Sequence, residues 1–174
     1  MNETIEILKT RRACRAYTGE QVKEEDLSAI LEAGTYAATG MGRQSPLIAV
    51  VQNPEDYKEL ERLNGRVMGN EDGHPFYGAP TVAVVFADST IPTFVADGNL
   101  VIGNLMNAAA AVGVDSCYIW RAAEVFDSDE GKALMAKWGV PEGFRGIGNV
   151  ILGYGKPEGK RDAAPRKDGY IVRI

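Results

Sequence analysis

The segment Thr81-Val82-Ala83-Val84-Val85-Phe86-Ala87 is apolar after its first residue and rich in β-branched side chains. Such side chains favour strands, and an unbroken apolar run is typical of a strand that is covered on both faces. The run is also too short to cross a bilayer. We therefore expect 81–87 to be the central strand of a sheet.

Strand-like and helix-like segments alternate along the rest of the chain. The sequence predicts further strands at 47–51, 114–119 and 146–152. Apolar spacing, capping residues and terminal glycines predict helices from the Asn2 cap to the first arginines and over 24–35, 54–63, 92–112 and 128–138. This interleaving predicts an α+β sandwich on one sheet of four or five strands.

The predicted helix 92–112 carries few charges, so we expect it to be buried on more than one side and to lie at a subunit interface. A length of 174 residues suits a single domain, 1–174. Residues 156–174 are rich in glycine, proline and charge and end in the apolar Tyr170, Ile171 and Val172. We expect them to form an extended C-terminal tail that lies across a partner surface.

Composition excludes several classes of function. With 19 Lys and Arg against 24 Asp and Glu, the net charge of −5 argues against nucleic acid as the main partner. The only histidine is His74, and Cys14 and Cys117 are isolated, so no disulfide framework, zinc site or histidine-activated nucleophile is expected. No signal peptide or membrane span is evident, and we expect a cytoplasmic protein.

Three guanidiniums lie within the five residues Arg11-Arg12-Ala13-Cys14-Arg15. Like charges this close repel unless they are solvated or face an anion, and arginine forks match phosphate oxygens in pairs. Extended, the run would span about 13 Å, enough to contact two parts of one ligand. From the residues alone, a solvated basic helix end is an equally good reading.

Residues 37–46 form a second candidate site, a long loop of small and polar residues before the strand at 47–51. Such a loop can bring main-chain N–H groups close to a ligand. Its Gly40-Met41-Gly42 is not a dinucleotide fingerprint, because it follows a helix and precedes a strand. A P-loop motif is also absent from the sequence.

Six segments in order resemble landmarks of the FMN-dependent nitroreductase family, in particular its short single-domain members. They are Arg11-Arg12-Ala13-Cys14-Arg15-Ala16-Tyr17, the loop 37–46, Phe76-Tyr77-Gly78-Ala79-Pro80, Gly113-Val114-Asp115-Ser116-Cys117-Tyr118-Ile119, Val140-Pro141-Glu142-Gly143-Phe144 and Leu152-Gly153-Tyr154-Gly155-Lys156-Pro157. The resemblance covers nearly the whole chain. Three positions depart from the family pattern, where Ala13 replaces Ser, Gly42 replaces Asn and Ser45 replaces Pro.

The resemblance implies an α/β/α sandwich with a central, mainly antiparallel sheet flanked by helices, in an intertwined homodimer. It also implies two FMN molecules at the subunit interface, with no metal. By this resemblance Arg11 and Arg12 lie near the phosphate and ribityl chain, Ala13 offers its N–H, and Arg15 lies at the pyrimidine edge. The other FMN-binding residues that it implies are Thr39, Gly40, Met41 and Gln44 from the partner subunit, Tyr118, Ile119 and Trp120 beside the ring, and Arg166 near the phosphate.

The implied activity is hydride transfer from NADH or NADPH, through flavin N5, to an electron-poor acceptor such as a nitroaromatic or a quinone. No catalytic protein residue is expected, because the cofactor carries the chemistry. Two alternatives stay open: another flavin reaction, such as reductive dehalogenation or enone reduction, and a non-catalytic FMN-binding or storage module. We expect Cys14 and Cys117 in the core, His74 in a loop, and Phe76 or Trp120 beside the substrate.

Overall fold

The computed structural model describes residues 2–174. Its strands are β1 (Pro46–Val51), β2 (Thr81–Asp88), β3 (Asp115–Ile119) and β4 (Phe144–Gly153). Its helices are α1 (Glu3–Thr10), α2 (Glu24–Thr35), α3 (Pro54–Val67), α4 (Phe94–Ala111), α5 (Ala122–Asp127) and α6 (Asp129–Lys137), with 3₁₀ turns η1 (Gly40–Gly42) and η2 (Pro157–Gly159).

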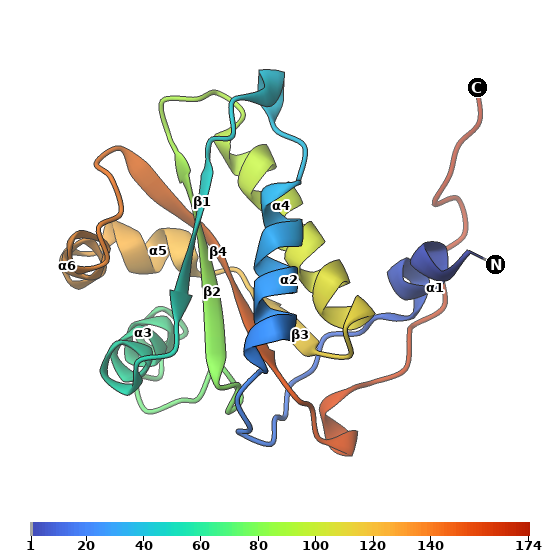
Figure 1. Cartoon of the computed structure of the whole chain (residues 1–174), viewed down its shortest axis with the longest axis horizontal. Helices are drawn as coiled ribbons and strands as arrows, with labels where there is room; N and C mark the ends of the chain where they lie inside the picture. The colour runs from blue at the N-terminus through green and yellow to red at the C-terminus, as the bar shows by residue number, and fades with distance from the viewer. Residues whose placement is uncertain (1) are drawn as a thin grey trace.

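The four strands form one sheet in the order β1-β2-β4-β3, and every neighbouring pair is antiparallel. The helices cover it on both faces, with α2 and α4 on one side and α3, α5 and α6 on the other (Figure 1). The predicted antiparallel sheet flanked by helices is therefore confirmed. Strand β2 lies inside the sheet, as its composition predicts.

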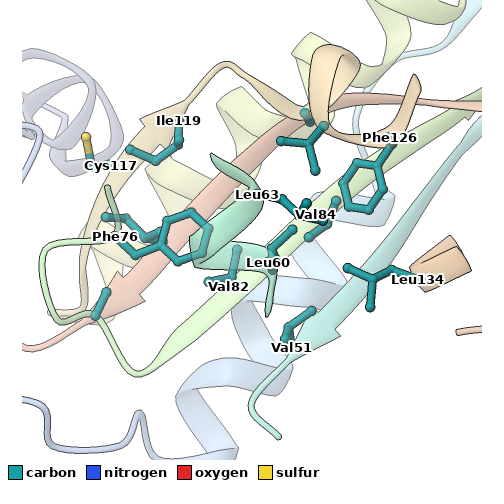
Figure 2. Close-up of a cluster of buried hydrophobic side chains, with 14 of the residues drawn as sticks. Val51, Leu60, Leu63, Phe76, Val82, Val84, Cys117, Ile119, Phe126 and Leu134 are labelled. Carbon is teal, nitrogen blue, oxygen red and sulfur yellow. The ribbon is translucent and has the colours of Figure 1, made fainter. Parts of the chain in front are cut away.

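Strand β2 is apolar throughout because each of its faces belongs to a different core. Val82, Val84 and Phe86 pack with α3, α5 and α6, whereas Ala83, Val85 and Ala87 pack with α2 and α4. Figure 2 shows the first of these cores, where Leu60 and Leu63 of α3 meet the strand. The small side chains on the second face let α4 approach the sheet closely.

Helix α4 packs on the sheet, on α2 and on α1, but it keeps exposed apolar side chains. Val101, Ile102 and Leu105 are buried against the sheet and α2. Val95 and Leu100 are about half exposed, at 51% and 50%. The predicted burial of α4 is therefore incomplete within the chain.

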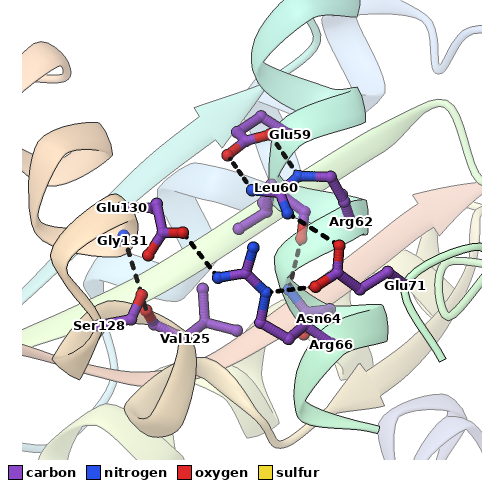
Figure 3. Close-up of polar contacts among 10 residues, drawn as sticks. All are labelled: Glu59, Leu60, Arg62, Asn64, Arg66, Glu71, Val125, Ser128, Glu130 and Gly131. Carbon is purple, nitrogen blue, oxygen red and sulfur yellow. Dashed lines mark hydrogen bonds and ion pairs between the residues drawn. The ribbon is translucent and has the colours of Figure 1, made fainter. Parts of the chain in front are cut away.

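Two helices differ from the prediction. Helix α3 continues to Val67, four residues beyond the predicted end, and α5 was not predicted. In α3 the Asn64 side chain donates to Leu60 O, and Arg62 and Arg66 bind the carboxylate of Glu71 beyond the helix end (Figure 3). Arg66 also reaches Glu130 of α6. These contacts between elements hold the last turn of α3.

Strand β4 also begins earlier than predicted, at Phe144, because Phe144 and Arg145 pair with the last residues of β2. Near the other end of the chain, Gly159 of the 3₁₀ turn η2 is buried beside Cys14 and Ala16. Residues 156–174 are exposed apart from Gly159, and 160–174 contain no helix or strand. Within residues 2–174, no helix combines the length and the apolar character that a membrane span needs.

Candidate functional site

The arginine run leaves the end of α1 in an extended conformation and is fixed there by main-chain bonds. Arg11, the C-cap of α1, has φ −56° and ψ 148°. Ala13 forms a parallel bridge with Ser116 of β3, and the Cys14 N–H donates to Ser116 O at 3.0 Å. Arg15 N–H then donates to Gly159 O at 2.8 Å. The run thus borders the free edge of β3.

A pocket of about 390 Å³ lies between this run and the tail, and we call it the basic pocket. Ala13 and the carboxylate of Asp162 line it. Its cationic lining comes from both ends of the chain: Lys9, Arg11, Arg12, Arg15, Arg161 and Arg166. A solvated helix end does not account for two further arginines that come from about 150 residues away in sequence. A concave site with this charge suits a phosphate group.

Arg11 and Arg12 of the basic pocket each make side-chain hydrogen bonds within the chain. The Arg11 Nε donates to Asn107 Oδ1 of α4 at 3.1 Å, which fixes the plane of the guanidinium. The Arg12 Nη1 donates to Lys9 O at 2.9 Å and to Arg11 O at 2.6 Å. Arg12 therefore caps the last carbonyls of α1 with part of its guanidinium, in addition to lining the pocket.

The predicted loop residues Thr39, Gly40, Met41 and Gln44 lie elsewhere, around η1 at the other end of α4 (Figure 1). Asp97 of α4 contacts this loop and Asn107 contacts Arg11, so the two groups are separated by ten residues, about 15 Å of helix. Thr39 and Gln44 line a different cavity, of about 380 Å³, between α2, α4 and β1. One chain does not bring the loop to the basic pocket.

The predicted residues at the end of β3 and directly after it differ in their surroundings. The Tyr118 hydroxyl lies 3.3 Å from Asn99 Oδ1, and burial raises the pKa of Tyr118. Ile119 is buried in the core of Figure 2, so only its main chain can face a ligand. Trp120 is 58% exposed. None of the three lines the basic pocket.

Of the two residues expected beside the substrate, Phe76 and Trp120, the prediction for Phe76 is wrong. Phe76 is completely buried, in an edge-to-face contact with Tyr57, and cannot meet a substrate.

The predicted core positions of Cys14 and Cys117 are confirmed, and burial raises the pKa of the Cys117 thiol. His74 lies in a loop with its side chain 81% exposed, 3.5 Å from Glu61. In residues 2–174 no group of three acidic, cysteine or histidine residues is placed to hold a metal ion.

Several residues at these sites were not predicted, among them Arg161, Asn107 and Asp97. Arg161 belongs to the basic tail, and its clustering with other cations was the available signal. Asn107 and Asp97 are, with Asn99 and Asn104, the polar residues of a mainly apolar helix. A buried polar side chain in such a helix needs partners, and that requirement was the signal in the sequence.

The chain is similar to known proteins in both sequence and structure. The family model described as the nitroreductase family matches residues 8–154. A nitroreductase with bound FMN from Bacteroides fragilis has 33% sequence identity and a TM-score of 0.92, with all of each chain covered. A nitroreductase with bound FMN from Desulfitobacterium hafniense has 27% identity and a TM-score of 0.89, covering 100% of this chain and 99% of that one. An NADPH-flavin oxidoreductase of Vibrio harveyi is 26% identical over 99% of this chain and 73% of its own length.

Proposed function

The chain belongs to the nitroreductase family, and from this premise we propose that it is an FMN-dependent oxidoreductase that uses NADH or NADPH as its electron donor. The family and the fold predicted from the sequence are confirmed. The observation that carries the proposal is the basic pocket, in which arginines from both ends of the chain surround one cavity.

The lining of the basic pocket fits a phosphate monoester. FMN phosphate carries nearly two negative charges at neutral pH, and Arg11, Arg12 and Arg166 offer guanidinium donors for its oxygens. Asn107 orients Arg11 before the ligand arrives, which lowers the entropy lost on binding. The Ala13 side chain removes the hydroxyl common in the family, so at this position the main-chain N–H is the donor.

Arg15 lies next to the phosphate-binding arginines and lines the same pocket. We propose that it borders the pyrimidine edge of the flavin, where its positive charge favours the form of the ring that carries additional negative charge. FMN, when bound, supplies a ring that takes a hydride from the nicotinamide and passes two electrons to an electron-poor acceptor. The chain's part is to bind, orient and shield the reacting molecules, and the proposal requires no acid or base from the protein.

A second subunit completes the proposed site. The loop of Thr39, Gly40, Met41 and Gln44 lies at the far end of α4 from the basic pocket, so we propose that it contacts the FMN of a partner chain. Trp120, which is largely exposed, would then lie beside the ring and its substrate, with Tyr118 and the main chain of Ile119. We propose a homodimer of single-domain subunits, residues 1–174, acting on nitroaromatic or quinone acceptors.

Titration of the purified protein with FMN, followed by anaerobic addition of NADH or NADPH, tests the proposal. We expect a yellow protein whose flavin absorbance is lost with at least one donor and returns when a nitroaromatic or a quinone is added. The variants Arg11→Ala and Arg166→Ala should bind FMN about 10- to 100-fold more weakly, since each loses charge-assisted hydrogen bonds worth about 1.5–3 kcal/mol.

Arg145→Ala is the matched control, because Arg145 pairs with Asp127 at the surface and lies outside the basic pocket. It should bind FMN as the wild type does. A wild-type protein that takes up no FMN would contradict the proposal. Bound FMN that neither donor reduces would instead indicate a flavin-binding or storage module.

A further inference from the structure

The buried carboxylate of Asp97, in the first turn of α4, accepts hydrogen bonds from the loop before β1. Its Oδ1 accepts from the Gly40 N–H at 2.9 Å. Its Oδ2 accepts from the Ser45 hydroxyl at 2.8 Å and from the Thr93 hydroxyl at 2.9 Å. Asp97 thus bonds near both ends of the segment 40–45 and joins it to the helix. Only 2% of this residue is exposed.

The segment between these two anchors holds a strained backbone. Met41 has φ 55° and Gln44 has φ 50°, left-handed values that cost free energy for any residue with a Cβ. The Gln44 N–H donates to the Thr39 hydroxyl at 3.0 Å, a further bond that closes the turn. Meanwhile the Met41 side chain is 78% exposed. Strain of this kind persists only where surrounding contacts impose it, and Asp97 supplies two of them, to Gly40 and Ser45.

Close packing adds to this constraint. A Cβ at Gly40 would collide with the Thr93 side chain, so the loop lies directly on the start of α4. Burial alone disfavours a carboxylate, but bonds from Gly40, Ser45 and Thr93 hold the pKa of Asp97 below its usual value. The position in the first helical turn also favours negative charge. The anchor is therefore an ionised group with donors on both of its oxygens.

We propose that Asp97 is a positioning residue, which holds the loop 39–45 in the conformation that it presents to FMN across the subunit interface. This inference rests on the proposed function, in which Thr39, Gly40, Met41 and Gln44 contact the partner's cofactor. Asp97 itself does not touch the ligand. Its role is to keep the loop in its strained form before FMN binds, so that less conformational entropy is lost on binding.

Trypsin reports the state of this loop directly. Arg43 is the only lysine or arginine between Lys23 and Lys58, so a cut after Arg43 gives a unique peptide. The rate of this cut is measured by mass spectrometry for purified wild type, Asp97→Ala and Asp97→Asn, with and without FMN. Asp56→Ala is the matched control, because it removes a carboxylate bonded to Lys137 on the opposite face of the sheet.

Without FMN, we expect Asp97→Ala to be cut at Arg43 at least tenfold faster than wild type and Asp56→Ala to be unchanged. Asp97→Ala should also bind FMN at least tenfold more weakly, and the visible circular dichroism of its bound flavin should differ. Asp97→Asn should stay within about threefold of wild type in both measurements. Its amide oxygen can still accept from Gly40, and its NH₂ can donate to the hydroxyls of Ser45 and Thr93.

Cleavage of Asp97→Ala at the wild-type rate would overturn the inference, because Asp97 would then not fix the loop. Fast cleavage with wild-type FMN affinity and spectrum would overturn it too, since the loop would then not serve the cofactor. A wild-type protein that binds no FMN would instead overturn the proposed function. The cleavage rates would still decide whether Asp97 holds the loop, so the two failures are distinguishable.

Discussion

The main chain of Arg15 is bonded to a different element from those that hold Arg11 and Cys14. Its N–H is bonded to Gly159 O, so the residue is fixed against η2 while its side chain lines the basic pocket. A positive charge beside the ring of a bound flavin stabilises the negative charge that the ring gains on reduction. The role that we propose for Arg15 therefore differs from that of the arginines that we propose to bind the phosphate.

Replacing Arg15 should therefore change the flavin and not only its binding. We expect Arg15→Ala to bind FMN about tenfold more weakly and to shift the potential of the bound flavin to more negative values, because the reduced ring loses a neighbouring positive charge. Arg15→Lys should keep most of the potential shift. Spectroscopic titration against redox dyes measures it. Wild-type affinity together with a wild-type potential in Arg15→Ala would show that the assigned role is wrong.

Asp97 gives a pH dependence whose sign follows from its environment. Its pKa in the folded protein lies below the ordinary value of 3.8, so its bonds stabilise the fold fully above that value. The contribution is lost as pH falls through the folded pKa. We expect the difference in unfolding free energy between wild type and Asp97→Ala to be constant from pH 8 to about 5 and to shrink below about pH 4. Urea unfolding at each pH measures it, and a difference that shrinks above pH 5 would contradict this assignment.

At the scale of elements, local signals identified the ends of helices well. The Asn2 side chain accepts from Thr4 N–H and caps α1, and Ser128 accepts from Gly131 N–H and caps α6. These bonds depend on neighbours in sequence, which is why they were predictable. The last turn of α3 depends on Glu71 and Glu130, and α5 packs on β4. Because these contacts are distant in sequence, no local pattern predicted the end of α3 or the presence of α5.

The cap of α6 provides a test of this local reasoning. We expect Ser128→Ala to lower the free energy of unfolding by about 1 kcal/mol, because the Gly131 N–H loses its acceptor. Ser128→Thr should retain most of the stability, since it keeps a hydroxyl at the N-cap. Chemical denaturation of both variants measures the difference. An unchanged stability in Ser128→Ala would mean that water replaces the cap without cost.

At the scale of the whole molecule, the predicted site residues divide into three groups, of which the third, Tyr118, Ile119 and Trp120, lies outside the basic pocket. Arg11, Arg12, Ala13, Arg15 and Arg166 share one pocket, and the sequence had already paired Arg166 with the run through the family resemblance. The loop residues lie at the opposite end of α4. The sequence contained the residues of these first two groups, but their separation along α4 is a property of the packed structure. The same separation is the physical argument for a second subunit.

The surface of the single chain supports this argument. Apolar side chains are exposed on α1, on α4 and on the tail, where Ile171 and Val172 are 79% and 78% exposed. At the other side of the sheet, β1 is an edge strand, and Ile48 and Val50 line a cavity beside it. An edge strand beside an apolar hollow favours the addition of an extended segment. We expect the apolar end of the tail to lie across a second copy of the chain.

The double variant Ile171→Asp, Val172→Asp tests this directly. Burying each side chain is worth about 1.5–3 kcal/mol, so loss of both from one tail weakens the dimer by at least about 100-fold. Arg166→Ala, in the same tail, should weaken FMN binding and leave the dimer intact, because its side chain faces the basic pocket. Sedimentation equilibrium measures the dimer, and FMN titration measures the site. If the double variant dimerises as tightly as wild type, the tail does not bind the partner, whereas a monomeric wild type would exclude the shared site itself.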